Sequence, residues 1–369
     1  MNFEFSEDQK FVQQTAREYL SEQASLELCR TVLDSDEVYA PDLWKGVAEM
    51  GWLGAAVPEQ YGGAGLGHLE LSLIAEEIGR SLAPIPFSSS VYLATEALLL
   101  FGSDAQKDRY LPRLVSGELV GAFAFSEGLG EPDVADSTTE FSGTELSGKK
   151  SPVMDGAAAD LLIVLAKQGE ILSLVLVETD ADGVTRRALA SLDPSRPLAS
   201  FEFDKAPAEI LGEAGRGFAY SERLLNRAAV LLAFEQVGGA DRALEITKEF
   251  TMGRYAFGRP VASFQVLKHR MVDWYGAIEL ARSNAYYGAW ALHHDNEELA
   301  VAACIARVAA CEAIDLAGDE IIQMHGGVGF TWEYDCHLFY KRSKLLSLGL
   351  GSAAHWRELL IQRLEARKF

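Results

Sequence analysis

The spacing of apolar residues changes twice along the chain, and this change constrains the fold more than any other feature. From about Leu119 to Leu211 the sequence consists of short β-like runs separated by Gly, Asp and Pro, among them VGAFAFSE, DLLIVLAK and ILSLVLVET. Such runs are typical of a small β-barrel or sandwich, whereas the flanking segments have helical spacing. We therefore predict an α+β, mostly α protein with an N-terminal helical domain (1–118), a middle β-barrel or sandwich domain (119–212) and a C-terminal four-helix bundle (213–369).

The helical segments carry recognisable start and stop signals. Ser6 and Gln9 form a capping-box pattern, and Pro112 and Gly117 predict the start and end of a short helix before the β domain. In the C-terminal domain we expect four long helices joined by short loops, at residues 219–255, 263–293, 298–325 and 336–367. Two apolar runs in these helices, VLLAF from Val230 and LLSLGL from Leu345, are predicted to form an association surface.

Charge and cysteine content exclude several classes of function. The chain has 33 Lys and Arg against 54 Asp and Glu, a net charge of −21. We therefore expect it to bind neither nucleic acid nor anionic membranes, and to hold any anionic cofactor through local cations and helix N-termini. The four cysteines form no CxxC pair and no metal-ligand spacing with the seven histidines. Because neither a signal peptide nor a membrane span is evident, we expect a cytoplasmic protein with reduced thiols and no metal.

Three segments match one enzyme family, in the same order. They are GWLGAAVPEQYGGAGLGHLELSLIAEEIG (51–79), RYAFGRPVASFQVLKH (254–269) and QMHGGVGFTWEY (323–334). Together with the helix–β–helix order, they resemble the N-terminal signature, the R-x-x-F-G-x-P segment and the Q-x-x-G-G-x-G segment of the acyl-CoA dehydrogenases. The resemblance covers essentially the whole chain. It implies an FAD-dependent enzyme that takes hydrogen from the α and β carbons of an acyl-CoA thioester.

The resemblance assigns one half of an FAD site. In this family the adenine and diphosphate of FAD are held largely by the C-terminal domain of a neighbouring subunit. The matching residues in this chain are Arg254, Phe257, Gln265, Gln323, Gly326 and Gly327. An arginine fork suits a diphosphate, and paired glycines let backbone approach phosphate closely. Without the resemblance, these residues would be interpreted as a surface arginine and a tight turn between helices.

The other half of the FAD site departs from the family pattern. Where members have [ST]-E-P-x-x-G-S-D over the flavin ring, residues 126–133 read SEGLGEPD, so that Glu131 and Pro132 replace Gly-Ser. In the following L-x-G-x-K-x-[WF]-I-[ST] segment the first half is kept, but Pro152 replaces the aromatic residue and Met154 the hydroxyl group. We predict that the flavin-ring side of the site is lost; tolerated drift in a working site is the alternative.

The catalytic base is the third departure. Family members use a carboxylate, whose pKa burial can raise toward neutral. Most carry it in a Y-E-G-T-like turn, where this chain has Leu350, and some carry it on the first long C-terminal helix, where this chain has Ala228. Glu235 lies two helical turns, about 10.5 Å, beyond Ala228. It is a weak candidate base; a structural glutamate in a buried polar network is the simpler interpretation.

Two further groups of residues admit two interpretations. His325 precedes the glycine pair, and it either contacts a phosphate of FAD or packs as a structural residue. Five aromatic residues resemble an aromatic box but, at helical spacing, favour a core or an interface: Trp274, Tyr275, Tyr286, Tyr287 and Trp290.

Three functions fit these features. In the first, the chain resembles the base-lacking subunit of α2β2 bacterial steroid-CoA dehydrogenases: it supplies adenine-side FAD contacts, and an unlike partner supplies the flavin-ring site and the glutamate. In the second, it is a self-sufficient homotetrameric dehydrogenase with Glu235 or another carboxylate as base. In the third, it is a flavin-binding or interaction protein without dehydrogenase activity, because fold alone does not fix chemistry. We predict the first, with an acyl-CoA substrate and an electron-transferring flavoprotein as the family's usual electron acceptor.

Overall fold

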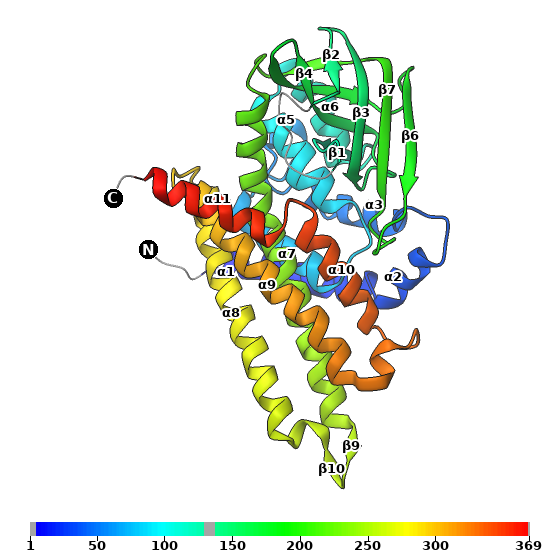
Figure 1. Ribbon diagram of the computed structural model, residues 1–369, viewed down its shortest axis with the longest axis vertical. Coiled ribbons are helices and arrows are strands. Elements are labelled where there is room, and N and C mark those ends of the chain that lie inside the picture. The colour runs from blue at the N-terminus through cyan, green and yellow to red at the C-terminus, as the bar shows by residue number, and fades with distance from the viewer. Residues whose placement is uncertain (1–4, 129–136, 368–369) are drawn as a thin grey trace. The chain divides into compact units, whose positions relative to one another are not determined.

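The computed structural model describes residues 5–128 and 137–367 of the chain (Figure 1). The chain divides into two compact units, each assembled from separate stretches of sequence. The helical unit comprises Met1–Arg30, His68–Ala83 and Ala229–Phe369. The sheet unit comprises Thr31–Gly67 and Pro84–Ala228. The three domain limits predicted from the sequence, 1–118, 119–212 and 213–369, stay a proposal.

The sheet unit begins with short helical elements. They are α3 (Pro41–Glu49), the 3₁₀ turns η1 (Trp52–Gly54) and η2 (Glu59–Tyr61), the π-helix η3 (Ser88–Thr95), α5 (Glu96–Phe101) and α6 (Asp104–Val115). The prediction that Pro112 opens a helix is wrong, because α6 already begins at Asp104. A capping box between Ser103 and Gln106 starts this helix, and Pro112 lies in its last turn.

Eight short strands form one mixed sheet. They are β1 (Gly121–Ala124), β2 (Glu140–Phe141), β3 (Glu145–Met154), β4 (Leu161–Gln168), β5 (Ile171–Glu178), β6 (Val184–Leu189), β7 (Leu198–Pro207) and β8 (Glu209–Leu211). The order is β6-β7-β3-β2-β4-β5-β8, with β1 also paired to β4. Both β1 and β2 run parallel to β4, and the remaining pairs are antiparallel. The predicted middle β region is therefore a single sheet.

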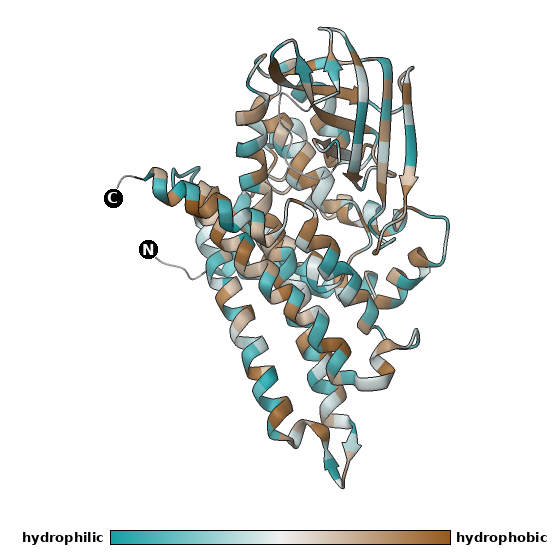
Figure 2. Cartoon of the chain, viewed as in Figure 1, coloured by the Kyte–Doolittle hydropathy of each residue, from teal (hydrophilic) through white to brown (hydrophobic). Residues whose placement is uncertain are grey.

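The sheet buries one apolar core and exposes a polar edge. Leu162, Val164, Val175 and Phe201 are among the buried residues of this core. At the edge, β6 has the sequence VTRRAL, part of which is coloured hydrophilic in Figure 2. Its four central residues are exposed. Charged side chains on an edge strand discourage pairing with another chain, so this edge is protected from aggregation.

The helical unit contains the long helices. They are α1 (Glu7–Gln23), the start of α2 (Leu26–Leu33), α4 (His68–Arg80), most of α7 (Gly217–Gly253), α8 (Gln265–His293), α9 (Leu299–His325), α10 (Cys336–Leu348) and α11 (Ala353–Ala366). The short hairpin of β9 (Tyr255–Ala256) and β10 (Arg259–Pro260) joins α7 to the 3₁₀ turn η4 (Val261–Ser263), and the 3₁₀ turn η5 (Gly326–Phe330) follows α9. The predicted helix 336–367 is thus two helices. It breaks at 349–352, where Ser352 accepts a hydrogen bond from the backbone N–H of His355 and caps α11.

Helix α7 packs against its neighbours through glycines. A Cβ atom at Gly79 of α4 would lie 1.8 Å from the carbonyl oxygen of Glu235, and one at Gly238 would lie 1.8 Å from that of Glu76. The backbones of α4 and α7 are therefore in direct contact, which larger residues would prevent. On another face of α7, Val230 packs against Gly288 of α8.

This packing corrects the predicted association surface. Val230, Leu231, Leu232 and Phe234 are all buried within the chain, because α7 is covered by α4, α8 and α9. In the second predicted run, Leu346 and Leu350 are buried and Leu348 is exposed. Four exposed large apolar residues lie on α8, namely Val266, Val272, Tyr275 and Leu280, and others lie on α1, α7, α10 and α11.

Candidate functional site

The segments that carry the predicted FAD residues meet at one end of the helical unit. They are the end of α7 with its hairpin, the start of α8, and the end of α9 with η5 (Figure 1). Phe250 of α7 stacks on His325 of α9, with ring centroids 4.1 Å apart. Arg270 of α8 binds Glu320 of α9 at 2.5 Å. The first contact joins residues 75 positions apart in the sequence, and the second joins residues 50 positions apart.

The hairpin presents Phe257 to solvent. Phe257 and Gly258 form its two-residue turn, with φ angles of 54° and 77°. Positive φ at both central residues is the signature of a type I′ hairpin turn, and it carries a strain cost for a phenylalanine. The Phe257 ring is 95% exposed, and its contact with Phe264 is only edge-on at 6.3 Å. A strained position that displays an apolar ring in this way is suited to contact another molecule.

Arg254, Gln265 and Gln323 are all exposed around this hairpin. The backbone of Arg254 is fixed, since its N–H donates to the carbonyl oxygen of Phe250 and its own carbonyl oxygen accepts from the N–H of Val261, at 2.9 and 2.8 Å. Gln265 is the first residue of α8, and Gln323 lies in the last turn of α9. Their polar groups, like the guanidinium group of Arg254, bind no side chain within the part of the chain that the structure describes.

Two glycines expose bare backbone at the end of α9. Gly326 has φ 64° and ψ −139°, a conformation that glycine tolerates and other residues avoid. A Cβ atom at Gly326 or at Gly327 would meet nothing within 4 Å. A side chain at either position would therefore not clash with the rest of the chain. At Gly329, by contrast, a Cβ atom would lie 2.5 Å from the carbonyl oxygen of Ile322. The open pair lets a ligand approach the backbone closely.

His325 and the aromatic residues have structural surroundings. His325 is buried, its Nδ1 lies 2.7 Å from the carbonyl oxygen of Ile321, and burial lowers the pKa of its imidazole. Trp274 is fully buried in α8, whereas Tyr275 is exposed. The other aromatic residues pair locally: Tyr286 stacks with Phe234, and Tyr287 with Trp290. These contacts favour packing over ligand binding for His325 and for the proposed aromatic box.

On the sheet unit, the retained motif residues bind each other. Glu127, from the S-E segment, and Lys150, from the L-x-G-x-K segment, form an ion pair of 2.7 Å. Glu127 also accepts hydrogen bonds from the hydroxyl of Ser137 and from the backbone N–H groups of Thr138 and Thr139, at 2.9, 2.7 and 3.2 Å. These contacts connect the chain on both sides of residues 129–136. Glu131 and Pro132 lie outside the described residues.

The pair has shifted titration properties. Burial opposes ionisation of Glu127, but the hydrogen bonds from Lys150 and Thr138 outweigh it and lower the pKa of the carboxyl to about 2. Burial lowers the pKa of the Lys150 ammonium, while Glu127 opposes that change. Both residues stood in the quoted motifs, yet sequence reasoning missed their pairing, because two residues 23 positions apart give no periodic signal.

The two substituted positions of the flavin-ring segment end strand β3. Pro152 is exposed and Met154 is half-buried. Just before them, the N–H of Ser151 donates to the carbonyl oxygen of Ser126 at 2.8 Å, which holds the strand against the Glu127 segment. Neither substituted side chain can donate a hydrogen bond to a flavin.

Both family positions for the base hold buried aliphatic residues. Leu350 is 4% exposed, in the break between α10 and α11, where its carbonyl oxygen accepts from Nε1 of Trp356 at 2.8 Å. Ala228 is fully buried. Glu235 is also fully buried, on the face of α7 that touches Gly79. Burial lowers the pKa of Arg307, and Glu235 is among the anions that oppose this, so Glu235 belongs to the electrostatic surroundings of a buried arginine.

The described residues show neither a metal site nor a membrane-spanning helix. Among the described residues, no group of His, Cys, Asp and Glu is placed to hold a metal ion, and no helix is both long and apolar enough to cross a membrane. All four cysteines are buried thiols.

Comparisons with known proteins agree with the motifs. The model of the acyl-CoA dehydrogenase N-terminal domain matches residues 6–118, and that of the C-terminal domain matches residues 215–365. Acyl-CoA dehydrogenase IpdE2 of Mycolicibacterium smegmatis is 32% identical, covering 99% of this chain and 100% of that protein. A variant of the steroid ACAD Tcur3481–Tcur3483 is 30% identical, covering 98% of both chains with a TM-score of 0.88.

The ChsE4–ChsE5 complex of Mycobacterium tuberculosis contains a chain that is 25% identical, with 100% of both chains covered and a TM-score of 0.90. These matches cover nearly the whole chain, with its helix–sheet–helix order, and not only the three short motifs. The chain therefore belongs to the acyl-CoA dehydrogenase family, whose members use FAD to dehydrogenate acyl-CoA thioesters.

Proposed function

We propose that this chain is the base-lacking subunit of an α2β2 acyl-CoA dehydrogenase. It supplies adenine-side contacts to an FAD whose flavin ring is bound by an unlike partner, and that partner supplies the catalytic glutamate. The observation that carries the proposal is Leu350, a buried leucine that is 4% exposed at the position where most members of the family have the base. Leucine cannot accept the α-proton.

The end of the helical unit fits the adenine and diphosphate of FAD. Arg254 would bind the diphosphate, since its guanidinium group is exposed and its backbone is fixed on both sides. Gly326 and Gly327 offer open backbone next to it. Gln265 and Gln323 would add amide donors and acceptors, and the exposed ring of Phe257 would add apolar contact.

The flavin-ring side of this chain fits poorly. When bound, FAD supplies the acceptor for the β-hydride of the acyl-CoA. The residues that should line its ring are Pro152 and Met154, which offer neither an aromatic face nor a hydroxyl group. Lys150, which precedes them on β3, and Glu127 already bind each other and other groups of this chain. A chain with one usable half-site requires a partner that has the other half.

A self-sufficient enzyme with Glu235 as base is less well supported. The side chain of Glu235 is fully buried in this chain. A general base must come within hydrogen-bond distance of the proton that it removes. Glu235 would have to leave the neighbourhood of Arg307 to do so, which would leave a buried arginine without one of its balancing charges.

The relatives support the finer parts of the proposal. One is a steroid ACAD formed by two named proteins, and another is a complex of two named proteins. We therefore propose a steroid side-chain CoA thioester as substrate, an electron-transferring flavoprotein as electron acceptor, and a cytoplasmic location. We propose no nucleic-acid or membrane partner, because the net charge is −21.

Co-expression with an acyl-CoA dehydrogenase that retains its glutamate tests the proposal. Native mass spectrometry of the purified complex should show two copies of each chain and two FAD molecules. This chain expressed alone should carry no FAD. A homotetramer of this chain with four FAD molecules would refute the loss of the flavin-ring half-site.

A further inference from the structure

A cavity in the helical unit lies among α1, α2, α4 and α7, apart from the residues assigned to FAD. Its volume is about 470 Å³, within the range of small-molecule sites. Its walls are lined by Arg17, Leu20, Ser21, Ala24, Ser25, Leu26, Glu77, Arg80, Ser81 and Arg242. Three arginines and one glutamate thus line this cavity in a chain whose net charge is −21. This concentration of cations calls for a physical explanation.

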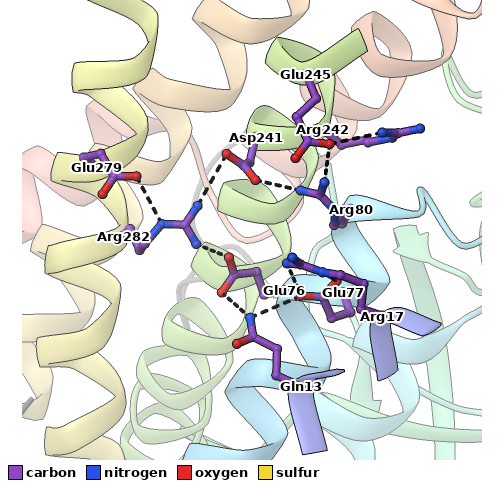
Figure 3. A network of polar contacts seen from close by, with 10 residues as sticks. All are labelled: Gln13, Arg17, Glu76, Glu77, Arg80, Asp241, Arg242, Glu245, Glu279 and Arg282. Carbon is purple, nitrogen blue, oxygen red and sulfur yellow. Dashed lines mark hydrogen bonds and ion pairs between the residues drawn. The ribbon is translucent and has the colours of Figure 1, made fainter. Parts of the chain in front are cut away.

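The carboxylate on the wall is already neutralised. Arg17 binds Glu77 through two nitrogens, at 3.0 and 2.8 Å, and Gln13 donates to the same carboxylate at 3.1 Å (Figure 3). Glu77 is 1% exposed, so these partners balance most of its charge although the residue lines the cavity. Arg17 itself remains half-exposed.

Arg80 and Arg242 are positioned by carboxylates that do not line the cavity. Arg80 of α4 binds Asp241 at 2.6 Å and also contacts Glu245 (Figure 3). Arg242 of α7 binds Glu245 at 3.1 Å through Nη1. These ion pairs fix the two guanidinium groups on the wall and place their counter-charges outside it.

Hydrogen-bond donors remain on these arginines. A guanidinium group has five N–H donors. Arg17 uses Nε and Nη2, and Arg242 uses Nη1, so the remaining donors of both bind nothing within the described residues. The Ser25 hydroxyl accepts from the N–H of Leu28 at the start of α2 and keeps its own proton to donate. The wall is therefore rich in donors and poor in free acceptors.

We propose that this cavity binds a phosphorylated small organic molecule. Its phosphate would be held by Arg17, Arg80 and Arg242, because planar guanidinium groups on separate helices match the several oxygens of a tetrahedral phosphate. Its organic part would pack on Leu20, Ala24 and Leu26, which form the apolar side of the cavity. Because α1, α4 and α7 each contribute one arginine, the ligand would link three helices of the helical unit.

The test uses phenyl phosphate, inorganic phosphate and phenol as probes. Each is titrated by calorimetry at constant ionic strength against the full chain in its FAD-loaded complex, so that the FAD site is filled. Phenyl phosphate should bind saturably and at least tenfold more tightly than inorganic phosphate, and phenol should not bind. Equal binding of phenyl phosphate and inorganic phosphate would overturn the organic part of the proposal. Absence of saturable binding would overturn all of it.

Arg242→Gln is the informative variant. Arg242 is partly exposed and its one ion pair lies within α7, so its loss should leave the fold intact, as a melting curve will verify. Arg17 is a poorer choice, because removing it would strand the buried Glu77. Arg242→Gln should weaken phenyl phosphate binding at least tenfold, and Arg242→Lys by less. Arg187→Gln, on the exposed edge strand β6, removes one positive charge far from these residues in sequence and is the control. It should leave the affinity for phenyl phosphate unchanged. Equal affinity in Arg242→Gln and Arg187→Gln would refute the assignment.

Discussion

The chain retains family motif residues in two regions, and the retained residues behave in opposite ways. At the end of α9 and on the β9–β10 hairpin, Arg254, Gln323 and Gly326 are exposed and satisfy no evident packing requirement inside the chain. On the sheet unit, the buried Lys150 and the half-buried Glu127 are bound to each other. A retained motif residue can therefore indicate a ligand in one region and only a structural need in another. Contacts within the chain separate the two cases.

Removing Lys150 should have the largest effect. In Lys150→Ala the Glu127 carboxylate loses its cation while it remains largely buried, and breaking a buried ion pair costs about 3–5 kcal/mol in unfolding free energy. The neighbouring Lys149→Ala is the matched control, because Lys149 is 56% exposed and only 3.8 Å from Glu202. It should cost less than about 1 kcal/mol. Urea unfolding measures the unfolding free energy of both variants. If the two variants lose the same unfolding free energy, the Glu127–Lys150 pair does not stabilise the fold.

Acid should expose the same pair. The folded pKa of Glu127, about 2, lies below its ordinary value of 4.5, so its stabilisation is complete above pH 4.5 and is lost as the pH falls toward 2. The shift corresponds to roughly 3 kcal/mol as an upper value. The difference in unfolding free energy between the native chain and Glu127→Gln should therefore shrink from pH 5 to pH 3. Glu140→Gln, an exposed site on β2, should show no such trend.

Arg254→Ala should act on the ligand and leave the fold unchanged. Loss of a charge-assisted contact with the FAD diphosphate should weaken flavin retention in the complex by about 1.5–3 kcal/mol. The unfolding midpoint of the chain alone should hardly change, because Arg254 is exposed. Flavin released per complex in a dilution series gives the first quantity, and Arg187→Ala is the charge-matched control. If Arg254→Ala lowers the unfolding midpoint but leaves flavin retention unchanged, Arg254 stabilises the fold and does not bind FAD.

Regular spacing and strong local signals made most of the fold predictable. The long helices and the β region follow from helical and strand spacing, and the predicted starts of α1 and α8 lie within two residues of the observed ones. The errors came from weaker or competing signals. Pro112 favours a helix start, but the capping box at Ser103 begins the helix at Asp104, eight residues earlier. The break at 349–352 has local signals in Gly349, Gly351 and the capping residue Ser352, but the apolar residues on both sides of it favour one continuous helix.

The candidate site could be assigned only through its motifs. The positions of Arg254, Gln265 and Gly326 came from family spacing, and the structure adds that their segments meet. The Glu127–Lys150 pair and the arginine-lined cavity depend on contacts between distant segments, which leave no periodic trace in the sequence. For the same reason, burial of the VLLAF run on α7 could not be foreseen: its apolar character fits a core and an interface equally well.

Placing a carboxylate at position 350 should have the smallest effect on activity. Leu350→Glu places a carboxylate at the position where most family members have one, yet the chain alone should still fail to oxidise acyl-CoA. Leu350 is 4% exposed, so the new side chain is desolvated and its pKa should rise. More decisively, a base cannot act without an aligned flavin, and we propose that Pro152 and Met154, without an aromatic face or a hydroxyl group, do not line one. Leu350→Gln controls for the cost of a buried polar group. The measurement is the rate at which each variant, without a partner chain, bleaches an electron acceptor. A higher rate for Leu350→Glu than for Leu350→Gln would mean that the flavin-ring half of the site is intact. The two motif regions would then differ only in how their residues are packed.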